Sequence, residues 1–514
     1  MAERKVKRTL KEASVTLQIA SGIVAIAVSF VLVLFGLKLT SPVFVPNIIF
    51  GGFVLAVIFY GAIVFFLSRK KLTAIISIFI SVILGAVLII GYGALSKSLN
   101  TISKVTESTE KEYLDVSVYV KSDSSINGIS ELSGLNVGYF SGDEYSSKMM
   151  EEIDAVNVTA PSYVEATGRV ALVDSLLNGE YSAIILNESF PDILCEQPGY
   201  ETLKDDIKSI YTKNIEVERE QQPAAANPGT GSTGQTGEGD SEAEDIPTIE
   251  LKEVYSLSED EDIFTVYISG IDKWGSIYTR SRSDVNIIAV VNAKNGKIQL
   301  INTPRDYYVY LPVQGAYDKL THAGLYGIDS SKAALEQLYG VKIDYYVRMN
   351  FSGFEKIIDS VGGIDVYSDY DFTVEPIKHY TVGYNHLTGL EALAFARERY
   401  AFAAGDIQRG NNQMAVIRGV IDKLTSPSVL IHLDQVLDGL EDTVSTDLPA
   451  DMIYNLASYQ FTTGKEWQIN NYTVTGKGES LTTYSMPDMP CYVMIPNEET
   501  VSEAVRLMES VLSE

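Results

Sequence analysis

A group of arginine and acidic residues lies between residues 389 and 424, in the segment GLEALAFARERYAFAAGDIQRGNNQMAVIRGVIDKL. It brings together Arg397, Arg399, Asp406, Arg409 and Gln413. Arginine presents a rigid planar fork of donors, which matches phosphate oxygens two at a time. We therefore interpret this group as a candidate phosphate or pyrophosphate site. The alternative is a surface helix whose charges are solvated.

The spacing of the group is helical. Asp406, Arg409 and Gln413 stand at i, i+3 and i+7, which places them on one face of a helix. Asp406 is expected to cap that helix. Arg397 and Arg399 come near the end of the preceding helix, across a short turn. Two helix ends would then meet at one anion.

A second group of charged residues flanks three predicted strands. Alternating apolar residues predict strands over 264–272, 283–293 and 296–306, with an Asn-Gly hairpin signal between the last two. Five charged residues lie beside these strands: Asp272, Arg282, Asp284, Arg305 and Asp306. Ligands of α/β sheets gather at strand ends, so this pattern favours a binding site over ordinary loop charges.

The length of 514 residues predicts two or three domains, and 46% hydrophobic residues are ample for their cores. The net charge of −27 is uneven, because residues 1–100 hold ten Lys or Arg and only two acids. That charge of +8 leaves −35 for residues 101–514. Residues 101–514 are therefore too acidic to favour binding to nucleic acid, because such binding depends on neutralising phosphates with basic side chains.

Short motifs exclude several other chemistries. The sequence contains no CxxC, HExxH or GxSxG motif, so zinc proteolysis and serine hydrolysis find no support. The two cysteines, Cys195 and Cys491, are far apart in the sequence. We expect two separate thiols rather than one disulfide.

Three apolar runs follow the N-terminus, over about residues 15–39, 45–67 and 72–95. Each is long enough to cross a hydrocarbon core of roughly 30 Å as a helix. A buried helix bundle is the alternative. Basic residues precede the first run and lie at 69–71, between the second and the third. This pattern places the N-terminus in the cytoplasm and the chain after residue 96 outside.

The rest of the chain reads as two α/β domains. Strands and helices alternate over 112–216, which predicts a small accessory domain. It contains no motif that indicates its role. Residues 217–250 are rich in proline, glycine, serine and acids, which predicts a flexible linker. A larger α/β domain is expected over 255–514.

Six motifs in this order resemble the LytR–CpsA–Psr family of cell-wall enzymes of Gram-positive bacteria: SRSDVNII, NTPRDYYV, KLTHAGLYG, YYVRMNF, GGIDV and RERYAFAAGDIQRGNNQ. The resemblance covers about residues 263–424 well and the remainder more loosely. Three spans with an accessory domain look most like the capsule-type members. One departure is Asn412-Gln413-Met414, where many members have Arg-Gln-Gln.

The resemblance implies an α/β/α sandwich with a central sheet and an apolar pocket for a polyprenyl tail. It also implies transfer of a glycopolymer from an undecaprenyl-pyrophosphate carrier to the 6-hydroxyl of N-acetylmuramic acid in peptidoglycan. The polymer is a capsule, a teichoic acid or another wall polysaccharide, and the enzyme faces outward from the cell membrane. Alternatives are a pyrophosphatase and a non-enzymatic regulator of envelope genes, although the short cytoplasmic part disfavours the regulator.

The resemblance further implies roles for the charged residues. Mg²⁺ is the expected metal, held by Asp272 and Asp284. The pyrophosphate would be bound by Arg282, Arg305, Arg397, Arg399, Arg409 and Gln413. Asp306 and Asp406 would orient these arginines or assist proton transfer, so that Arg305, Asp306, Arg397 and Asp406 form the catalytic group. The opposing interpretation is that Asp272 and Asp284 only pair with Arg282 and Arg305 as structural salt bridges.

Overall fold

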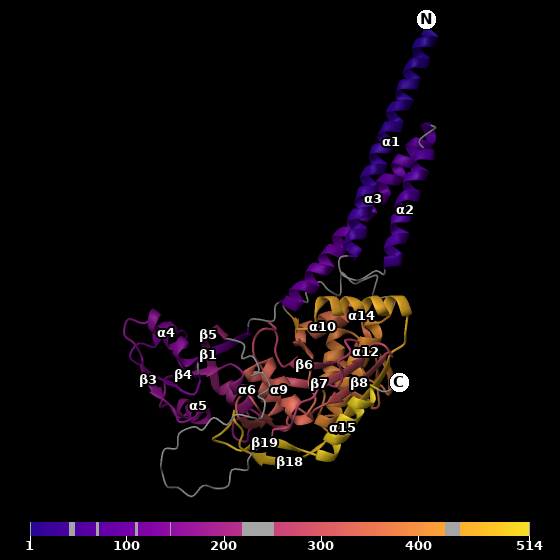
Figure 1. The fold of residues 1–514 in the computed structure, drawn as a ribbon. Helices are drawn as coiled ribbons and strands as arrows, with labels where there is room; N and C mark the ends of the chain where they lie inside the picture. Colours follow the sequence, from indigo (N-terminus) through magenta and orange to yellow (C-terminus); the bar gives the residue numbers. More distant parts are fainter. Residues whose placement is uncertain are drawn as a thin grey trace, which may run out of the picture. The chain divides into compact units, whose positions relative to one another are not determined.

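The computed structural model describes residues 2–40, 47–67, 71–107, 112–143, 145–217, 251–426 and 443–512 (Figure 1). The expected linker therefore lies almost wholly outside the described residues. The chain divides into two compact units. The first comprises Met1–Glu107, Asp422–Glu441 and Leu448–Glu466, and the second comprises Ser108–Ile421, Asp442–Asp447 and Trp467–Glu514.

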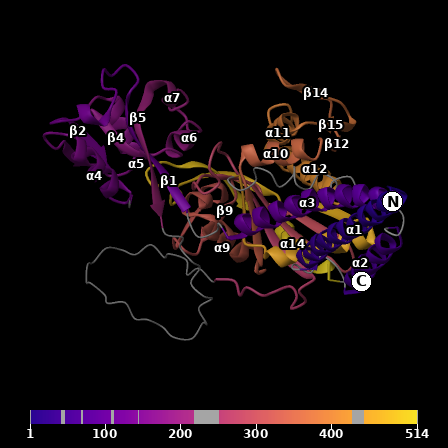
Figure 2. The same ribbon diagram turned by 90° about the horizontal axis from the view of Figure 1, so that it is seen from above.

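Three N-terminal helices form most of the first unit: α1 (Ala2–Thr40), α2 (Asn47–Leu67) and α3 (Lys71–Glu107). They lie side by side in Figures 1 and 2, and α14 (Ala450–Thr463) belongs to the same unit. The stretches Val15–Leu37 and Leu72–Gly93 are long and apolar enough to cross a membrane. The described part of α2 offers a shorter apolar stretch, Val54–Leu67. The described residues thus support two candidate spans rather than three, and the span expected over 45–67 stays a prediction.

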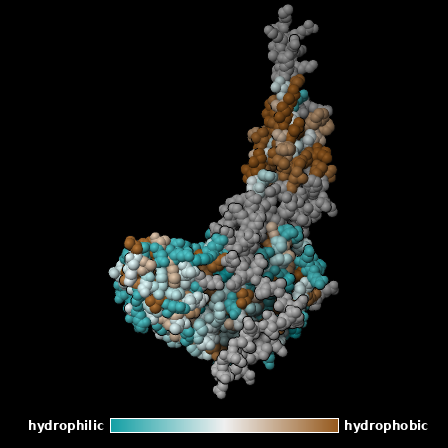
Figure 3. Space-filling model, turned by 60° about the vertical axis from the view of Figure 1, so that its left-hand side comes forward, coloured by the Kyte–Doolittle hydropathy of each residue, from teal (hydrophilic) through white to brown (hydrophobic). Residues whose placement is uncertain are grey.

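Large apolar side chains cover the outside of these helices (Figure 3). Ile26 is 72% exposed, Phe59 68% and Ile90 72%. A bundle at the centre of a soluble protein would bury such side chains, because water-exposed apolar surface is unfavourable. This exposure favours helices that face lipid.

The second unit begins with a five-stranded mixed sheet, formed by β1 (Glu112–Lys121), β2 (Asn136–Tyr139), β3 (Ser162–Glu165), β4 (Ala183–Asn187) and β5 (Ile207–Val217). The strand order is β3-β2-β4-β1-β5. β1 is antiparallel to both of its neighbours, and β2 is parallel to β3 and β4. The helices of this part are α4 (Ser146–Val156), α5 (Arg169–Leu177), α6 (Phe190–Leu194) and α7 (Leu203–Asp206).

Alternation along β1 builds a core on each face of this sheet. Val116 belongs to a buried cluster that includes Met149 of α4, whereas Tyr119 belongs to a second cluster with Leu172 of α5. The second cluster also contains Met486, far along the chain. Because its core takes in a residue from the C-terminal part, the accessory sheet is continuous with the rest of the second unit.

A six-stranded sheet forms the larger part of the unit, with the order β16-β11-β6-β7-β8-β17. Its strands are β6 (Ile263–Ile271), β7 (Ser283–Asn292), β8 (Lys297–Asn302), β11 (Tyr345–Met349), β16 (Val444–Thr446) and β17 (Gln468–Thr473). β6, β7 and β8 run antiparallel in succession, while β11 is parallel to β6 and β17 to β8. The three predicted strands and the hairpin between β7 and β8 are confirmed, except that β8 ends at Asn302, so Arg305 and Asp306 lie in the loop that follows it.

Four two-stranded ribbons complete the strands: β9 (Tyr308–Leu311) with β10 (Ala316–Lys319), β12 (Ile364–Ser368) with β15 (Gly383–Leu387), β13 (Phe372–Val374) with β14 (Lys378–Tyr380), and β18 (Gly476–Leu481) with β19 (Cys491–Pro496). The helices are α8 (Leu320–Ala323), α9 (Ile328–Tyr339), α10 (Phe351–Ser360), α11 (Gly389–Arg397), α12 (Asp406–Leu424) and α15 (Glu498–Ser510). Cys195 and Cys491 are both free, as expected.

The large sheet has a closed face and an open face. Tyr267 of β6 pairs in register with Ile288 of β7, and both are buried with Leu335 of α9 and Met508 of α15. The next residue, Ile268, points to the opposite face, where it lines a cavity under α10, α11 and α12. The mixed α/β fold is confirmed, and the open face carries the candidate site.

Candidate active site

A β-bulge at the end of β6 and β7 positions the first acidic residue. Gly270 lies opposite Val285, and Ile271 lies opposite Ser283, so Asp284 has no partner on the facing strand. Such an extra residue bends the strand and re-aims its side chain. Gly270 has a packing role here, because a Cβ atom would lie 2.8 Å from the Val285 side chain. The bulge thus brings Asp284 into the cavity.

Asp284 is held in its ionised form by arginine. Arg305 Nη1 donates to Asp284 Oδ1 at 3.1 Å, and Thr321 Oγ1 donates to the same oxygen at 3.0 Å. Burial alone would raise the pKa of Asp284, but Arg305, Arg282 and Arg409 outweigh it and the pKa is lowered. Arg305 Nε is buried, makes no hydrogen bond with the described residues, and lies 3.8 Å from Asp306 Oδ2.

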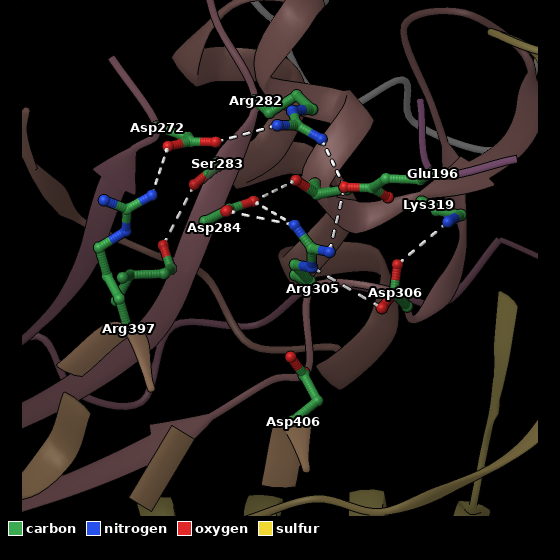
Figure 4. A network of polar contacts seen from close by, with 12 residues as sticks. Glu196, Asp272, Arg282, Ser283, Asp284, Arg305, Asp306, Lys319, Arg397 and Asp406 are labelled. Carbon is green, nitrogen blue, oxygen red and sulfur yellow. Dashed lines mark hydrogen bonds and ion pairs between the residues drawn. The ribbon is translucent and has the colours of Figure 1, made fainter. Parts of the chain in front are cut away.

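Asp272 follows β6 and faces two arginines (Figure 4). Arg282 Nη2 donates to Asp272 Oδ2 at 2.9 Å, and Arg397 Nη2 lies 3.8 Å from Oδ1. Burial and the charge of Asp284 raise the pKa of Asp272 despite these arginines. Burial is the larger of these two causes, and the charge of Asp284 adds to it.

A third carboxylate, Glu196, completes this centre and was missed in the sequence. Its Oε1 accepts from Arg282 Nη1 at 2.8 Å and from Arg305 Nη2 at 3.2 Å (Figure 4). Burial would raise the pKa of Glu196, but Arg305 and Arg282 outweigh it and the pKa is lowered. Glu196 follows α6, in the segment expected to form a separate accessory domain. No local pattern distinguishes it, since it is one of 67 acids in the chain.

Two further arginines lie against aromatic rings. The Arg397 guanidinium is 4.4 Å from the centre of the Phe351 ring, and that of Arg399 is 4.7 Å from the centre of the Tyr400 ring. Arg399 Nη2 also donates to the Tyr400 hydroxyl at 2.6 Å. Stacking holds the face of a guanidinium while its in-plane N–H groups remain suited to oxygen acceptors. The aromatic partners were not predicted.

Asp406 was expected to cap α12 from the position before the helix, but it is the first residue of the helix. The helix begins at Asp406, and the Arg409 backbone N–H donates to the Gly405 carbonyl, so Gly405 rather than Asp406 precedes the helix. Asp406 instead forms an ion pair with Arg409 one turn on. Arg409 and Gln413 line the same cavity, as their spacing predicted. Arg409 is only 7% exposed, so the interpretation as a solvated surface helix is wrong at this position.

Asp306 lies behind the arginines. Its nearest cationic partner is Lys319, whose Nζ is 3.1 Å from Oδ1, while Arg305 Nε is 3.8 Å from Oδ2. Neither Asp306 nor Asp406 is among the residues that line the cavity. Both carboxylates therefore reach the cavity only through the arginines beside them.

The cavity measures about 310 Å³ and has a charged and an apolar part. Its polar lining is Glu196, Asp272, Arg282, Asp284, Arg305, Asn350, Arg397, Arg399, Arg409 and Gln413. Its other walls are Ile268, Gly270, Ile271, Val285, Met349, Phe351, Phe354, Leu393, Ala396, Tyr400 and Ile417. With all groups ionised, five arginines and three carboxylates give this lining a charge of +2. Eight of the ten predicted site residues thus converge on one cavity.

The two aspartates suit Mg²⁺ only as a partial ligand set. No cluster of three or more His, Cys, Asp or Glu with metal-ligand geometry occurs among the described residues. Mg²⁺ commonly binds through one or two carboxylates together with phosphate oxygens and water, so two aspartates are sufficient in kind. The salt bridges of Asp272 with Arg282 and of Asp284 with Arg305 are nevertheless present.

The fold and the site together define an α/β domain with one cavity that is lined by five arginines and by apolar side chains. The LytR_cpsA_psr family model matches residues 231–497, which is just over half of the chain. The chain therefore belongs to the LytR_cpsA_psr family.

The chain is also similar to curated proteins of known name and to solved structures. A Bacillus cereus "polyisoprenyl-teichoic acid–peptidoglycan teichoic acid transferase TagU" is 35% identical over 205 residues, which cover 40% of this chain and 66% of that protein. The Bacillus subtilis transferase TagT is 33% identical over 209 residues, covering 38% and 64%. The chain thus spans slightly less than two thirds of these curated relatives.

The structure "TagT bound to LIIa-WTA" shares 25% identity with a TM-score of 0.40, over 52% of this chain and 97% of that one. That of Bacillus subtilis TagU shares 26% identity with a TM-score of 0.39, over 49% and 98%. Both TM-scores are below 0.5, so family membership stands on the family model.

Proposed function

We propose that this protein transfers a glycopolymer from an undecaprenyl-pyrophosphate carrier to the N-acetylmuramic acid of peptidoglycan. The observation that carries the proposal is the convergence of five arginines on one cavity that also has a large apolar lining. The arginines suit the pyrophosphate, and the apolar walls suit the polyprenyl chain. The names of the relatives favour a teichoic acid as the polymer, while a capsule polysaccharide fits the same site.

The residues act by alignment and charge neutralisation, which dominate phosphoryl transfer. The acceptor hydroxyl attacks the sugar-linked phosphorus, and the bond to the bridging oxygen breaks, so that lipid phosphate leaves. Arg282, Arg305 and Arg409 are each under 10% exposed and are therefore held in place before the donor binds. Asp406 forms an ion pair with Arg409 and would orient that arginine, while the proton of the acceptor hydroxyl would leave to water in the cavity. Asp272 and Asp284 would hold Mg²⁺, which supplies positive charge to the pyrophosphate oxygens when bound.

We place the enzyme in the cell membrane of a Gram-positive bacterium, with its N-terminus in the cytoplasm and the catalytic unit outside. The basic residues at 69–71 support a cytoplasmic turn before the third apolar run. The topology requires the run at 45–67 to cross the membrane together with Val15–Leu37 and Leu72–Gly93. A reporter that works only in the cytoplasm, fused after Thr106, is expected to be inactive. Activity of that reporter would overturn the topology.

The transfer reaction is tested with the full chain, a lipid-linked glycopolymer and peptidoglycan fragments. We expect polymer to become covalently attached to the acceptor, as measured by mass spectrometry. Release of lipid phosphate without attachment would support the pyrophosphatase instead. If neither attached polymer nor released lipid phosphate were found, the non-enzymatic regulator would be the remaining alternative.

Replacing Arg397 or Arg399 by alanine should lower transfer by at least about tenfold, because each change removes charge-assisted contacts worth roughly 1.5–3 kcal/mol. The fold should survive, since the Arg397 side chain is 56% exposed. Arg506→Ala is the matched control, because Arg506 is an exposed arginine paired with Glu503. Unchanged turnover in both site variants, with equal thermal unfolding, would reject their role.

A further inference from the structure

The accessory sheet contributes a carboxylate to the anion site. Arg282 and Arg305 have side chains only 8% and 6% exposed, and both donate to the same oxygen of Glu196. Figure 4 shows the Glu196 side chain reaching between the two guanidinium groups. One oxygen that accepts from two arginines has the arrangement of a phosphate oxygen held by an arginine pair. Glu196 thus lies where a bound anion would.

The backbone on either side of Glu196 is anchored. Ile193 and Leu194 of α6 are buried in the core of the accessory sheet, with exposures of 2% and 0%. The Cys195 N–H donates to the Pro191 carbonyl at 2.9 Å, and the Gln197 N–H donates to that of Leu194 at 2.8 Å. The packing of the accessory sheet therefore fixes where Glu196 lies.

Other contacts hold the accessory sheet in place without Glu196. Glu112 of β1 pairs with Arg280 at 2.7 Å and with Arg348 at 3.4 Å. The Tyr113 N–H donates to the Tyr278 carbonyl at 2.9 Å, and the Arg280 N–H donates to the Tyr113 carbonyl at 2.7 Å. Because these contacts are buried or part of the backbone, removing one carboxylate at the cavity leaves the docking intact.

We propose that Glu196 is a built-in competitor for the anion site of Arg282 and Arg305, which must withdraw before the donor's pyrophosphate can bind both arginines. The proposal rests on the proposed function, since it takes pyrophosphate as the anion. Withdrawal of Glu196 changes the charge of the lining from +2 to +3 and frees donors of two arginines. Donor binding is thereby coupled to a change in the side-chain conformation of Glu196, whose backbone the accessory sheet holds at the edge of the site.

The test compares the full chain in detergent with its Glu196→Gln variant, which keeps the shape of the side chain and removes its charge. Isothermal titration calorimetry with inorganic pyrophosphate, in a chelator, measures the anion affinity without metal. We expect Glu196→Gln to bind pyrophosphate at least about tenfold more tightly, because an opposing like charge is removed. Glu152→Gln is the matched control, since the Glu152 side chain is 39% exposed against 30% for Glu196, and Glu152 of α4 pairs with Lys213 of β5, away from the cavity.

The possible results separate the competitor role of Glu196 from the proposed function. Equal or weaker binding by Glu196→Gln, in a variant that unfolds at the wild-type temperature, would overturn the competitor role. If Arg305→Lys nevertheless weakened pyrophosphate binding, the proposed function would stand and only the competitor role of Glu196 would be rejected. If neither the wild type nor Glu196→Gln bound pyrophosphate, both the competitor role and the proposed function would be rejected. Should Glu196→Gln fail to fold, Glu196→Asp, whose carboxylate is one methylene shorter, is expected to bind pyrophosphate more tightly than the wild type, and equal binding would overturn the proposal.

Discussion

Replacing Arg305 by alanine is expected to lower glycopolymer transfer by at least about 100-fold, because two charge-assisted contacts of roughly 1.5–3 kcal/mol each are lost. Arg305 donates to both Asp284 and Glu196, and its side chain is only 6% exposed. The change also leaves Asp284 buried beside Glu196 with less opposing charge, which costs stability. Transfer rates and thermal unfolding of the full chain are measured together.

Arg305→Lys separates the site effect from the stability effect. Lysine keeps the positive charge but cannot donate to two carboxylates through a planar fork. We expect this variant to fold like the wild type and still to lose at least about tenfold in transfer, from one lost contact of roughly 1.5–3 kcal/mol. Arg506→Ala, at an exposed ion pair, should keep full activity. Wild-type transfer by Arg305→Lys would show that the fork geometry of Arg305 is not needed.

Replacing Asp284 by asparagine should abolish the dependence on magnesium and reduce transfer by at least about 100-fold, if Asp284 is one of two carboxylates on the metal. The bulge between β6 and β7 directs Asp284 into the cavity, where burial and the charge of Asp284 raise the pKa of Asp272. A cation between the two carboxylates would remove the effect of that charge. Magnesium binding is followed by calorimetry, and release of lipid phosphate with and without a chelator.

Asp272→Asn is expected to weaken magnesium binding in the same way. Asp365→Asn is a suitable control, because the Asp365 side chain is 69% exposed and pairs with His386 at the surface. Undiminished activity in a chelator, or in both site variants, would leave only the interpretation of structural salt bridges. The distances of 2.9 Å from Arg282 to Asp272 and 3.1 Å from Arg305 to Asp284 show that those bridges form readily.

The sequence by itself determined the elements that carry the site. Period-two alternation and the Asn-Gly signal predicted β6, β7, β8 and the hairpin between the last two, because these patterns act over a few neighbouring residues. Helical spacing placed Arg409 and Gln413 on one face of α12, which lines the cavity. Charged residues at strand ends identified Asp272 and Asp284 for the same local reason.

Only the tertiary structure decided how distant segments meet. Glu196 reaches arginines 86 and 109 residues further along the chain, and no local pattern specifies a contact over that separation. The bulge that directs Asp284 depends on the register between two strands, and the stacking of Arg397 on Phe351 depends on how α10 and α11 pack. The placement of Asp306 behind Arg305, next to Lys319, has the same origin. Propensity and spacing act between near neighbours, whereas these contacts arise when separately formed elements bury their apolar faces against one another.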